Sequence, residues 1–157
     1  HGVLRTAWVI SAWRSNFLKT MLRLAGERPE LRVLADQHGC PTGARDIAGA
    51  LRTIALAHLA DALAPCGTYH FVNAGSTTWH GLAEAVIAAH RSHGGPAVPV
   101  VPISSGDFPT RARRPANSRL DTARLQRDFG IAPRSWQEIV PEIVGEVMAD
   151  QQARTTA

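Results

Sequence analysis

The chain has 157 residues, of which 45% are hydrophobic and 19% charged, a composition typical of a soluble globular domain with one sizeable core. No apolar run approaches the roughly 20 residues of a membrane span, which argues against a membrane-spanning protein. Two cysteines are too few for a disulfide framework and favour a cytoplasmic location, and the formal net charge of +4 favours an anionic ligand.

The first half of the chain predicts two strands, each followed by a helix. Residues 3–10 are mostly apolar, as in a buried strand of a parallel sheet, and Asn16 is a good N-cap for the helix expected up to residue 28. A second strand is expected at 31–36. The long helix expected at 44–63 opens on Arg45 and Asp46, predicted as a solvent-exposed pair. Its apolar stripe comprises Ile47, Leu51, Ile54, His58 and Leu59.

The second half continues this alternation. A third strand is expected at 67–74, a helix at 76–95, and an edge strand at 97–104, where prolines interrupt the pattern. A short helix at 120–130, with Asp121 as its N-cap, precedes a last helix opening at Ser135 and a polar tail at 151–157 that is expected to fray. Alternating strands and helices predict an α/β fold with at least part of the sheet parallel.

Several kinds of catalytic motif are missing. The glycines form no dinucleotide-binding turn and no P-loop, and the only tyrosine, Tyr69, has Asn73 where a Tyr-x-x-x-Lys pair needs lysine. His38 with Cys40 and Cys66 with His70 match no common zinc spacing, so no metal site is predicted. We therefore expect no catalytic residue in this chain.

Positive charge is concentrated near the end of the chain, in the stretch "DFPTRARRPANSRL". It carries Arg111, Arg113, Arg114 and Arg119 and follows Phe108, which is expected to be buried. A nucleic-acid site is not predicted, because interleaved aromatic residues and recognised nucleic-acid-binding motifs are missing.

Three motifs, in this order and at this spacing, resemble the C-terminal half of dTDP-4-dehydrorhamnose reductases, members of the extended short-chain dehydrogenase/reductase superfamily. They are "RTAWV", "DQHGCPTG" and "PTRARRPANSRL", and the resemblance runs from about residue 3 to 148. It implies a fragment: the C-terminal part of a Rossmann-type parallel sheet plus a small α/β substrate-binding lobe, without the N-terminal dinucleotide-binding half. Residues 1–150 would form one truncated unit, with late Rossmann strands at about 3–10 and 67–74 and the lobe at about 30–45 and 76–148.

The resemblance also implies a reaction, the reduction of dTDP-4-dehydro-L-rhamnose to dTDP-L-rhamnose by NADPH or NADH. The cofactor and the Tyr-x-x-x-Lys pair would belong mainly to the other half. For the full-length family, the resemblance implies that a bound magnesium ion and a homodimer are possible. A non-catalytic sugar-nucleotide-binding or regulatory relative is the alternative. The isolated chain is expected to be inactive, and marginally stable or prone to aggregation.

Six residues are predicted to bind the substrate. Trp8 would provide a flat wall for the sugar, Asn16 would help to hold the nucleotide-sugar, and Gln37 would read a hydroxyl or the base. Arg114, joined by Arg111 or Arg113, would clamp the diphosphate through bidentate hydrogen bonds, and one or two of the four arginines of the stretch would contact the ligand. Each has a structural alternative: a core tryptophan, a helix cap, or arginines paired with acidic side chains.

Overall fold

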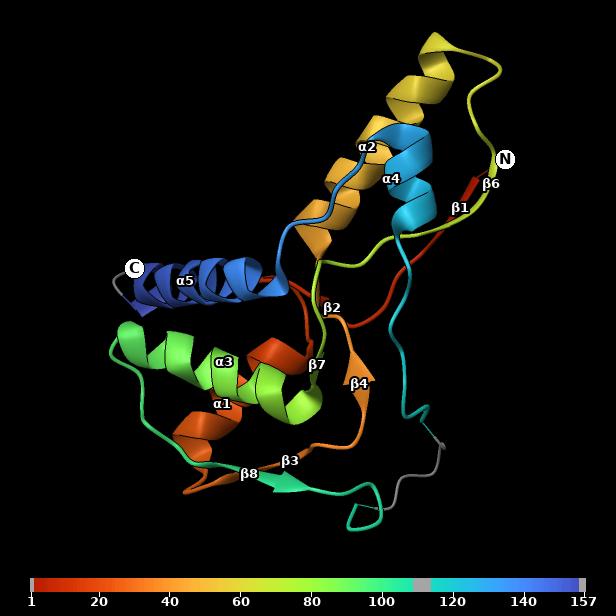
Figure 1. Cartoon of the computed structure of the whole chain (residues 1–157). Coiled ribbons are helices and arrows are strands. Elements are labelled where there is room, and N and C mark those ends of the chain that lie inside the picture. The colour runs from red at the N-terminus through yellow and green to blue at the C-terminus, as the bar shows by residue number, and fades with distance from the viewer. Residues whose placement is uncertain (1, 109–113, 156–157) are drawn as a thin grey trace.

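The structure is a computed structural model that describes residues 2–108 and 114–155. Within these residues the chain forms five helices, eight short strands and two parts, a helical body and a projecting arm (Figure 1). The helices are α1 (Phe17–Glu27), α2 (Ala44–Ala60), α3 (Trp79–Ser92), α4 (Ala123–Phe129) and α5 (Trp136–Thr155). The strands are β1 (Gly2–Arg5), β2 (Val9–Ile10), β3 (Leu31–Leu34), β4 (His38–Gly39), β5 (Thr42–Gly43), β6 (Gly67–His70), β7 (Thr77–Thr78) and β8 (Val100–Ile103).

The described strands form four two-stranded sheets. β1 pairs with β6, β2 with β5 and β3 with β8, all in parallel, whereas β4 and β7 are antiparallel. This confirms the predicted α/β class with parallel pairing. β8 has β3 as its neighbour and contains Pro102, as expected of an edge strand.

The body contains the larger core, formed where α3 lies beside α5 and α1 (Figure 1). The N-cap predicted for α1 is present, since Asn16 accepts from the backbone of Lys19, and α3 is capped by the Thr78 hydroxyl, which accepts from Gly81. Fully buried side chains from all three helices fill the interior, among them Leu18, Leu82, Val86, Ile139, Val140 and Val144.

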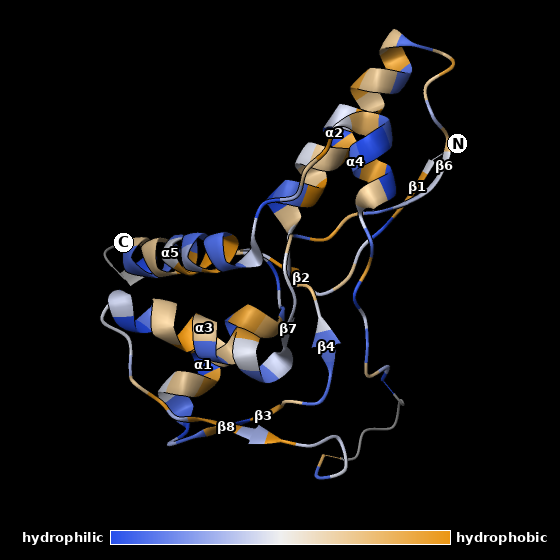
Figure 2. Ribbon diagram, in the orientation of Figure 1, coloured by the Kyte–Doolittle hydropathy of each residue, from blue (hydrophilic) through white to orange (hydrophobic). Residues whose placement is uncertain are grey.

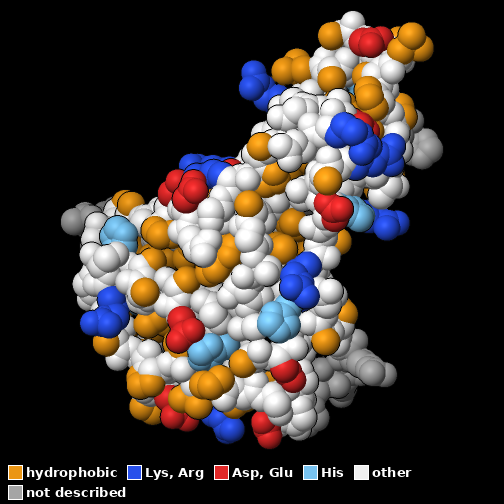
Figure 3. Space-filling model, in the orientation of Figure 1, with side chains coloured by type: hydrophobic (Ala, Val, Ile, Leu, Met, Phe, Trp, Pro, Cys, Tyr) orange, Lys and Arg blue, Asp and Glu red, His pale blue; other side chains and the backbone are white. Residues whose placement is uncertain are grey.

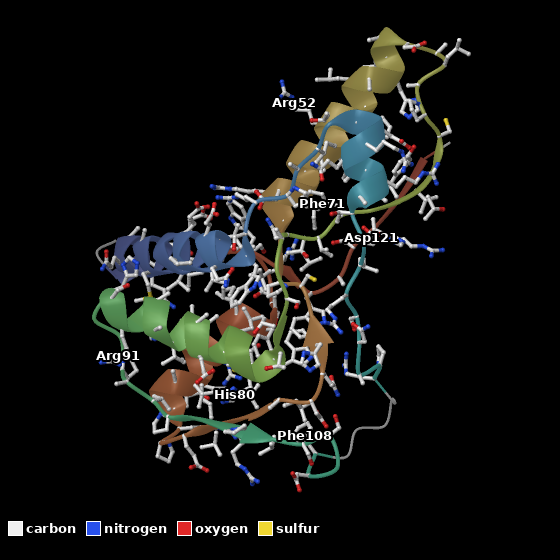
Figure 4. All side chains as sticks on the ribbon, in the orientation of Figure 1. Arg52, Phe71, His80, Arg91, Phe108 and Asp121 are labelled. Atoms are coloured by element: carbon white, nitrogen blue, oxygen red, sulfur yellow. The ribbon has the colours of Figure 1, made fainter. Side chains whose placement is uncertain are left out.

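The arm consists of β1, β6, α2 and α4, with a smaller core of its own. Tyr69, Phe71 and Leu125 are its large buried side chains. The Tyr69 hydroxyl donates to Asp128 over 2.9 Å. Burial, together with this bond, raises the pKa of Tyr69, and the same bond lowers the pKa of Asp128. In Figure 4, Phe71 lies between α2 and α4.

Three predicted elements differ in the structure. The strand expected at 3–10 is two strands in different sheets, because Trp8 adopts a φ of 49° and turns the chain. Asp121 precedes the cap position, which Thr122 occupies, although its carboxylate accepts from Ala123 N at 2.8 Å. The tail predicted to fray from 151 continues α5 as far as Thr155.

The apolar stripe predicted for α2 is covered in part. Ile47 and Ile54 are half-buried against the core of the arm, and the His58 ring lies 6.1 Å from that of Phe129. Leu51 and Leu59, in contrast, are 49% and 84% exposed. Figure 2 shows α2 apolar over much of its length, although it lies on the outside of the arm. Within residues 2–108 and 114–155, no helix combines the length and apolar character needed to cross a membrane.

Candidate functional site

Trp8 lies at the junction between arm and body, where the chain turns from β1 to β2. Its ring stacks on Trp79 with 3.6 Å between centroids and an interplanar angle of 10°. On β4, a Cβ at Gly39 would overlap the same indole, so glycine is needed there. The left-handed backbone of Trp8 costs about 1–2 kcal/mol, which these contacts offset. The half-buried indole is therefore held in one orientation.

Gln37 and its neighbour Asp36 form hydrogen bonds to Ser105, in the turn after β8. The Gln37 amide nitrogen, Nε2, donates to the Ser105 hydroxyl over 3.0 Å, and the residue is 7% exposed. Asp36 accepts from both the backbone and the hydroxyl of Ser105, and these bonds lower the pKa of Asp36. The Asp36 and Gln37 side chains therefore both hold Ser105 in this turn.

The last part of the arginine-rich stretch, residues 116–119, is held against β4. The backbone of His38 donates to Ala116 and accepts from Ser118, both at 2.8 Å. Arg119 is folded back on Asn117, whose Oδ1 accepts from its Nε at 2.9 Å. Arg114 lies two residues before Ala116 and is exposed. This strand-like pairing places Arg114 on the same side of the body as Gln37 and β4.

Two predicted phosphate contacts, Arg111 and Arg113, lie outside the described residues. Phe108, expected to be buried, is 57% exposed and lies at the periphery of the body, in the turn after β8 (Figure 4). The correction has a local reason: Asp107 accepts from the backbone and hydroxyl of Ser104, which closes the turn and leaves the next side chain outside. The sequence reasoning missed that this aromatic side chain is exposed.

Asn16 has the structural role that was its alternative reading. Its Oδ1 accepts from Lys19 N at 3.3 Å, and its Nδ2 donates to Ser11 O at 2.8 Å. Both polar atoms of the side chain thus hold the loop that follows β2 and the start of α1.

An ionic network joins the start of α2 to α5. Arg134 contacts Asp46 at 3.1 Å and Glu142 at 2.6 Å, while Arg45 contacts Glu146 at 2.6 Å. These pairs line an open groove that also includes Trp13. Arg45 and Asp46 were expected to pair with each other in solvent; instead each contacts a residue far along the chain. No local sequence pattern indicates these partners.

The described residues do not fit a dinucleotide or a metal ion. β1 is followed by Thr6, Ala7 and Trp8, where a phosphate-binding turn needs glycines, and the left-handed glycines of the structure are scattered through the described chain. Among residues 2–108 and 114–155, no cluster of three His, Cys, Asp or Glu side chains could hold a metal. Burial raises the pKa of the Cys40 thiol, which disfavours the nucleophilic thiolate.

Comparison with known proteins gives this arrangement a family. Residues 1–149 match the RmlD substrate binding domain. A dTDP-4-dehydrorhamnose reductase of Sinorhizobium fredii is 42% identical over 96% of this chain, and one of Burkholderia thailandensis is 44% identical over 92%. The chain spans about half the length of these relatives, 51% of each.

Solved structures agree in fold. The dTDP-4-dehydrorhamnose reductase of Bacillus anthracis, in complex with NADP, superposes with a TM-score of 0.78 at 31% identity, over 91% of this chain and 47% of that one. The orthologue from Clostridium acetobutylicum superposes with a TM-score of 0.79, also at 31% identity and over 47% of its chain. The predicted class, part of a Rossmann-type reductase fold, is confirmed. The chain belongs to the RmlD substrate-binding-domain family.

Proposed function

We propose that the chain is the substrate-binding portion of an NAD(P)H-dependent reductase that converts dTDP-4-dehydro-L-rhamnose to dTDP-L-rhamnose in the cytoplasm, for cell-envelope polysaccharide. The observation that carries this proposal is the match of residues 1–149 to the substrate binding domain of this family. Relatives at 42% and 44% identity bear the name dTDP-4-dehydrorhamnose reductase.

The sugar nucleotide would lie across the surface bounded by Trp8, Gln37 and the arginine stretch. Trp8 is rigid enough to serve as a wall, since Trp79 and Gly39 contact its ring. Arg114, with Arg111 or Arg113, would hold the diphosphate through guanidinium forks. Asn16 would act at most indirectly, by holding the loop after β2.

Hydride transfer would need groups that this chain does not supply. The Bacillus anthracis reductase was solved in complex with NADP, and NADPH or NADH is the cofactor we propose for the whole enzyme. Because the described residues form no dinucleotide-binding turn, the cofactor and the proton donor would come from the part of the enzyme that this chain does not span. The chain alone would bind substrate without turnover.

Titration of the isolated chain with dTDP-L-rhamnose tests this proposal. We expect weak, saturable binding, seen as a change in tryptophan fluorescence, and no NADPH oxidation in the presence of dTDP-4-dehydro-L-rhamnose. Oxidation of NADPH by this chain alone would contradict the proposed division of labour. Failure to bind dTDP-L-rhamnose, by a chain shown to be folded by circular dichroism, would contradict the substrate assignment. Binding without turnover, when the other half of a relative is supplied, would favour the regulatory alternative.

A further inference from the structure

The Trp8 indole is covered from above and from below. The Trp79 ring lies nearly parallel to it, with 3.6 Å between the ring centroids. A Cβ built on Gly39 would lie closest to Trp8 Cε2 and 2.6 Å from both Cζ2 and Nε1. Because Cε2 is set back between those two atoms, a point in the ring plane outside the ring would be closer to them than to Cε2. Gly39 therefore approaches a face of the indole and not its edge.

Gly39 and Trp79 cover opposite faces of the Trp8 ring. The three atoms nearest to the built Cβ all belong to Trp8, whereas a ring stacked on the same face would have to contact that position. Phe17 packs against Trp79, with 4.6 Å between centroids, and the Trp8 carbonyl accepts from Thr42 N at 3.0 Å. Both faces of the indole are thus occupied, and the backbone that carries it is fixed.

The part of Trp8 that stays open belongs to its rim, since the residue is only half-buried. In the described part of the chain, the buried side-chain atoms without a hydrogen-bond partner are His90 Nδ1 and Trp136 Nε1. Trp8 Nε1 has no partner among the described residues and is not one of these buried atoms, so it reaches solvent. The side chain therefore offers a ligand one N–H donor at its rim, where the sequence predicts a flat wall.

This donor lies beside β4, the strand that adjoins the other predicted substrate contacts. Trp8 Nε1 is one of the atoms closest to Gly39, which ends β4 two residues after Gln37. His38, in the same strand, forms a bridge with Asn117 of the arginine-rich stretch. A ligand whose diphosphate is held by that stretch would therefore have its sugar within the same region as the Trp8 rim.

We propose that Trp8 recognises the sugar through its Nε1–H edge instead of a ring face, and thereby selects a sugar with an oxygen at the contacted carbon. This inference rests on the proposed function, because it takes a sugar nucleotide as the ligand. A hydroxyl or keto oxygen accepts this hydrogen bond, whereas a methyl group, which an open indole face would suit, does not. A desolvated donor without an acceptor costs free energy, so the rim discriminates between substituents by their chemistry.

The indole N–H resonances of the full chain test this contact. The chain has four tryptophans, so a nitrogen–proton correlation spectrum contains four such signals, and the Trp8 signal is the one missing from Trp8→Phe. On titration with dTDP-L-rhamnose, the Trp8 signal should shift downfield and its proton should exchange with water at least about tenfold more slowly. dTDP, which has the diphosphate but no sugar, should bind without this change.

Trp8→Phe keeps a ring between Gly39 and Trp79 but removes the donor. It should weaken binding of dTDP-L-rhamnose about fivefold, the effect of one neutral hydrogen bond, and leave the affinity for dTDP unchanged. Trp13→Phe is the matched control, because Trp13 is 61% exposed in the groove beside α5 and should change neither affinity. Far-ultraviolet circular dichroism checks that both variants fold.

Two results would overturn the proposal while dTDP-L-rhamnose still binds: an unchanged Trp8 signal, or equal weakening of dTDP and dTDP-L-rhamnose by Trp8→Phe. Large shifts of the Trp8 and Trp79 signals together, with loss of the near-ultraviolet signal of the stack, would also overturn it, because a ring face would then open to the ligand. If the folded chain binds no dTDP-L-rhamnose, the substrate assignment itself fails, and this contact fails with it.

Discussion

Arg134 contacts two helices and the segment after β6 at the junction between arm and body. Its Nε lies 3.1 Å from Asp46 of α2, its two terminal nitrogens contact Glu142 of α5 at 2.6 and 2.8 Å, and its own carbonyl accepts from Asn73. Asn73 also donates to Asp46 at 2.6 Å and accepts from Gly43. The paired guanidinium lowers the pKa of Glu142. Removal of Arg134 would leave two carboxylates facing each other.

Replacement of Arg134 by alanine should therefore destabilise the protein. We expect a loss of about 1 kcal/mol in urea unfolding, a value kept small because the side chain is 39% exposed and screened by solvent. Arg23→Ala, which removes an exposed pair with Glu27 within α1, is the matched control and should cost less than about 0.5 kcal/mol. Equal costs would show that the junction network contributes nothing beyond a surface pair.

His90 predicts a pH dependence at the other end of the body. Its ring is 7% exposed, its Nδ1 has no hydrogen-bond partner among the described residues, and burial, with His93, lowers its pKa. Above the unfolded value of 6.5 both states are neutral and stability is complete. Below it the unfolded chain gains a proton that the folded chain resists, so stability falls as the pH falls.

We expect the Tm to fall by a few degrees between pH 7 and pH 5, at about 2–4 °C for each 1 kcal/mol lost. His90→Phe, which keeps a ring without the titration, should flatten this slope, whereas His93→Gln should keep most of it. The pKa values of the Asp128 and Glu142 carboxylates are lowered, so their contribution to stability is lost at a lower pH than that of His90 and does not account for a change between pH 7 and pH 5. An unchanged slope in His90→Phe would assign it to another group.

Arg114 is the described arginine whose placement best fits the proposed diphosphate clamp. Arg114→Ala should weaken binding of dTDP-L-rhamnose to the isolated chain about tenfold, since a charge-assisted bond to an ionised group contributes about 1.5–3 kcal/mol. Arg91→Ala is the control: Arg91 is an exposed arginine on α3, well away from Phe108 in Figure 4. An unchanged Kd for Arg114→Ala would exclude this residue from the clamp.

At the scale of elements, short strands serve as connectors between helices. β4 pairs with β7 on one side and with the segment around Asn117 on the other, and it lies against the Trp8 ring. β5 pairs with β2 directly after the Trp8 turn. These strands together hold Trp8, Gln37 and Arg114 in one region, although they come from distant parts of the chain.

Gly39→Ala should test this arrangement. The added methyl would overlap the Trp8 indole, so the stack on Trp79 must shift, at a cost of about 1–3 kcal/mol. Near-ultraviolet circular dichroism should report the altered tryptophan pair, and affinity for dTDP-L-rhamnose should fall. Gly26→Ala, in α1 with open space around it, should instead stabilise the protein by about 0.5–1 kcal/mol. Full affinity with a disturbed tryptophan pair would remove Trp8 from the site.

At the scale of the whole molecule, the arm carries several large apolar side chains that are exposed to solvent. Leu51, Leu56, Leu59 and Leu63 are all at least 49% exposed. Figure 3 shows hydrophobic side chains gathered over the end of the arm. Exposed apolar patches of this kind mark an interaction site or an aggregation liability.

The isolated chain should therefore self-associate as its concentration rises and should bind the dye ANS. Replacing Leu59 and Leu63 together with lysine should reduce both effects, because these side chains are 84% and 89% exposed and contribute little to the core. Thr53→Lys with Ala60→Lys, both in α2, adds the same charge to the arm without removing a leucine. Equal improvement in both variants would assign the effect to charge instead of apolar surface.

Much of the fold was predictable because helix signals are local. Asn16, Thr78 and Gly130 act within a few residues of their own helix ends, so the positions of α1, α3 and α4 follow from neighbouring residues. The apolar stripe of α2 is covered at Ile47 and Ile54 but not at Leu51 and Leu59, because periodicity shows which residues share a face but not how much of that face is covered. Of the predicted site residues, the structure brings Gln37 and Arg114 to one side of the body and assigns Asn16 to the α1 cap.

The sequence by itself determined the α/β class, the order of the elements and the family motifs, since these depend on residue type and spacing along the chain. Only the tertiary structure decided the turn at Trp8, the Asp36 and Gln37 contacts with Ser105, and the bonds from Arg124 that close one edge of the arm. Each of these joins groups whose separation in sequence bears no relation to their distance in space. Their geometry is set by packing between elements, which no local pattern encodes.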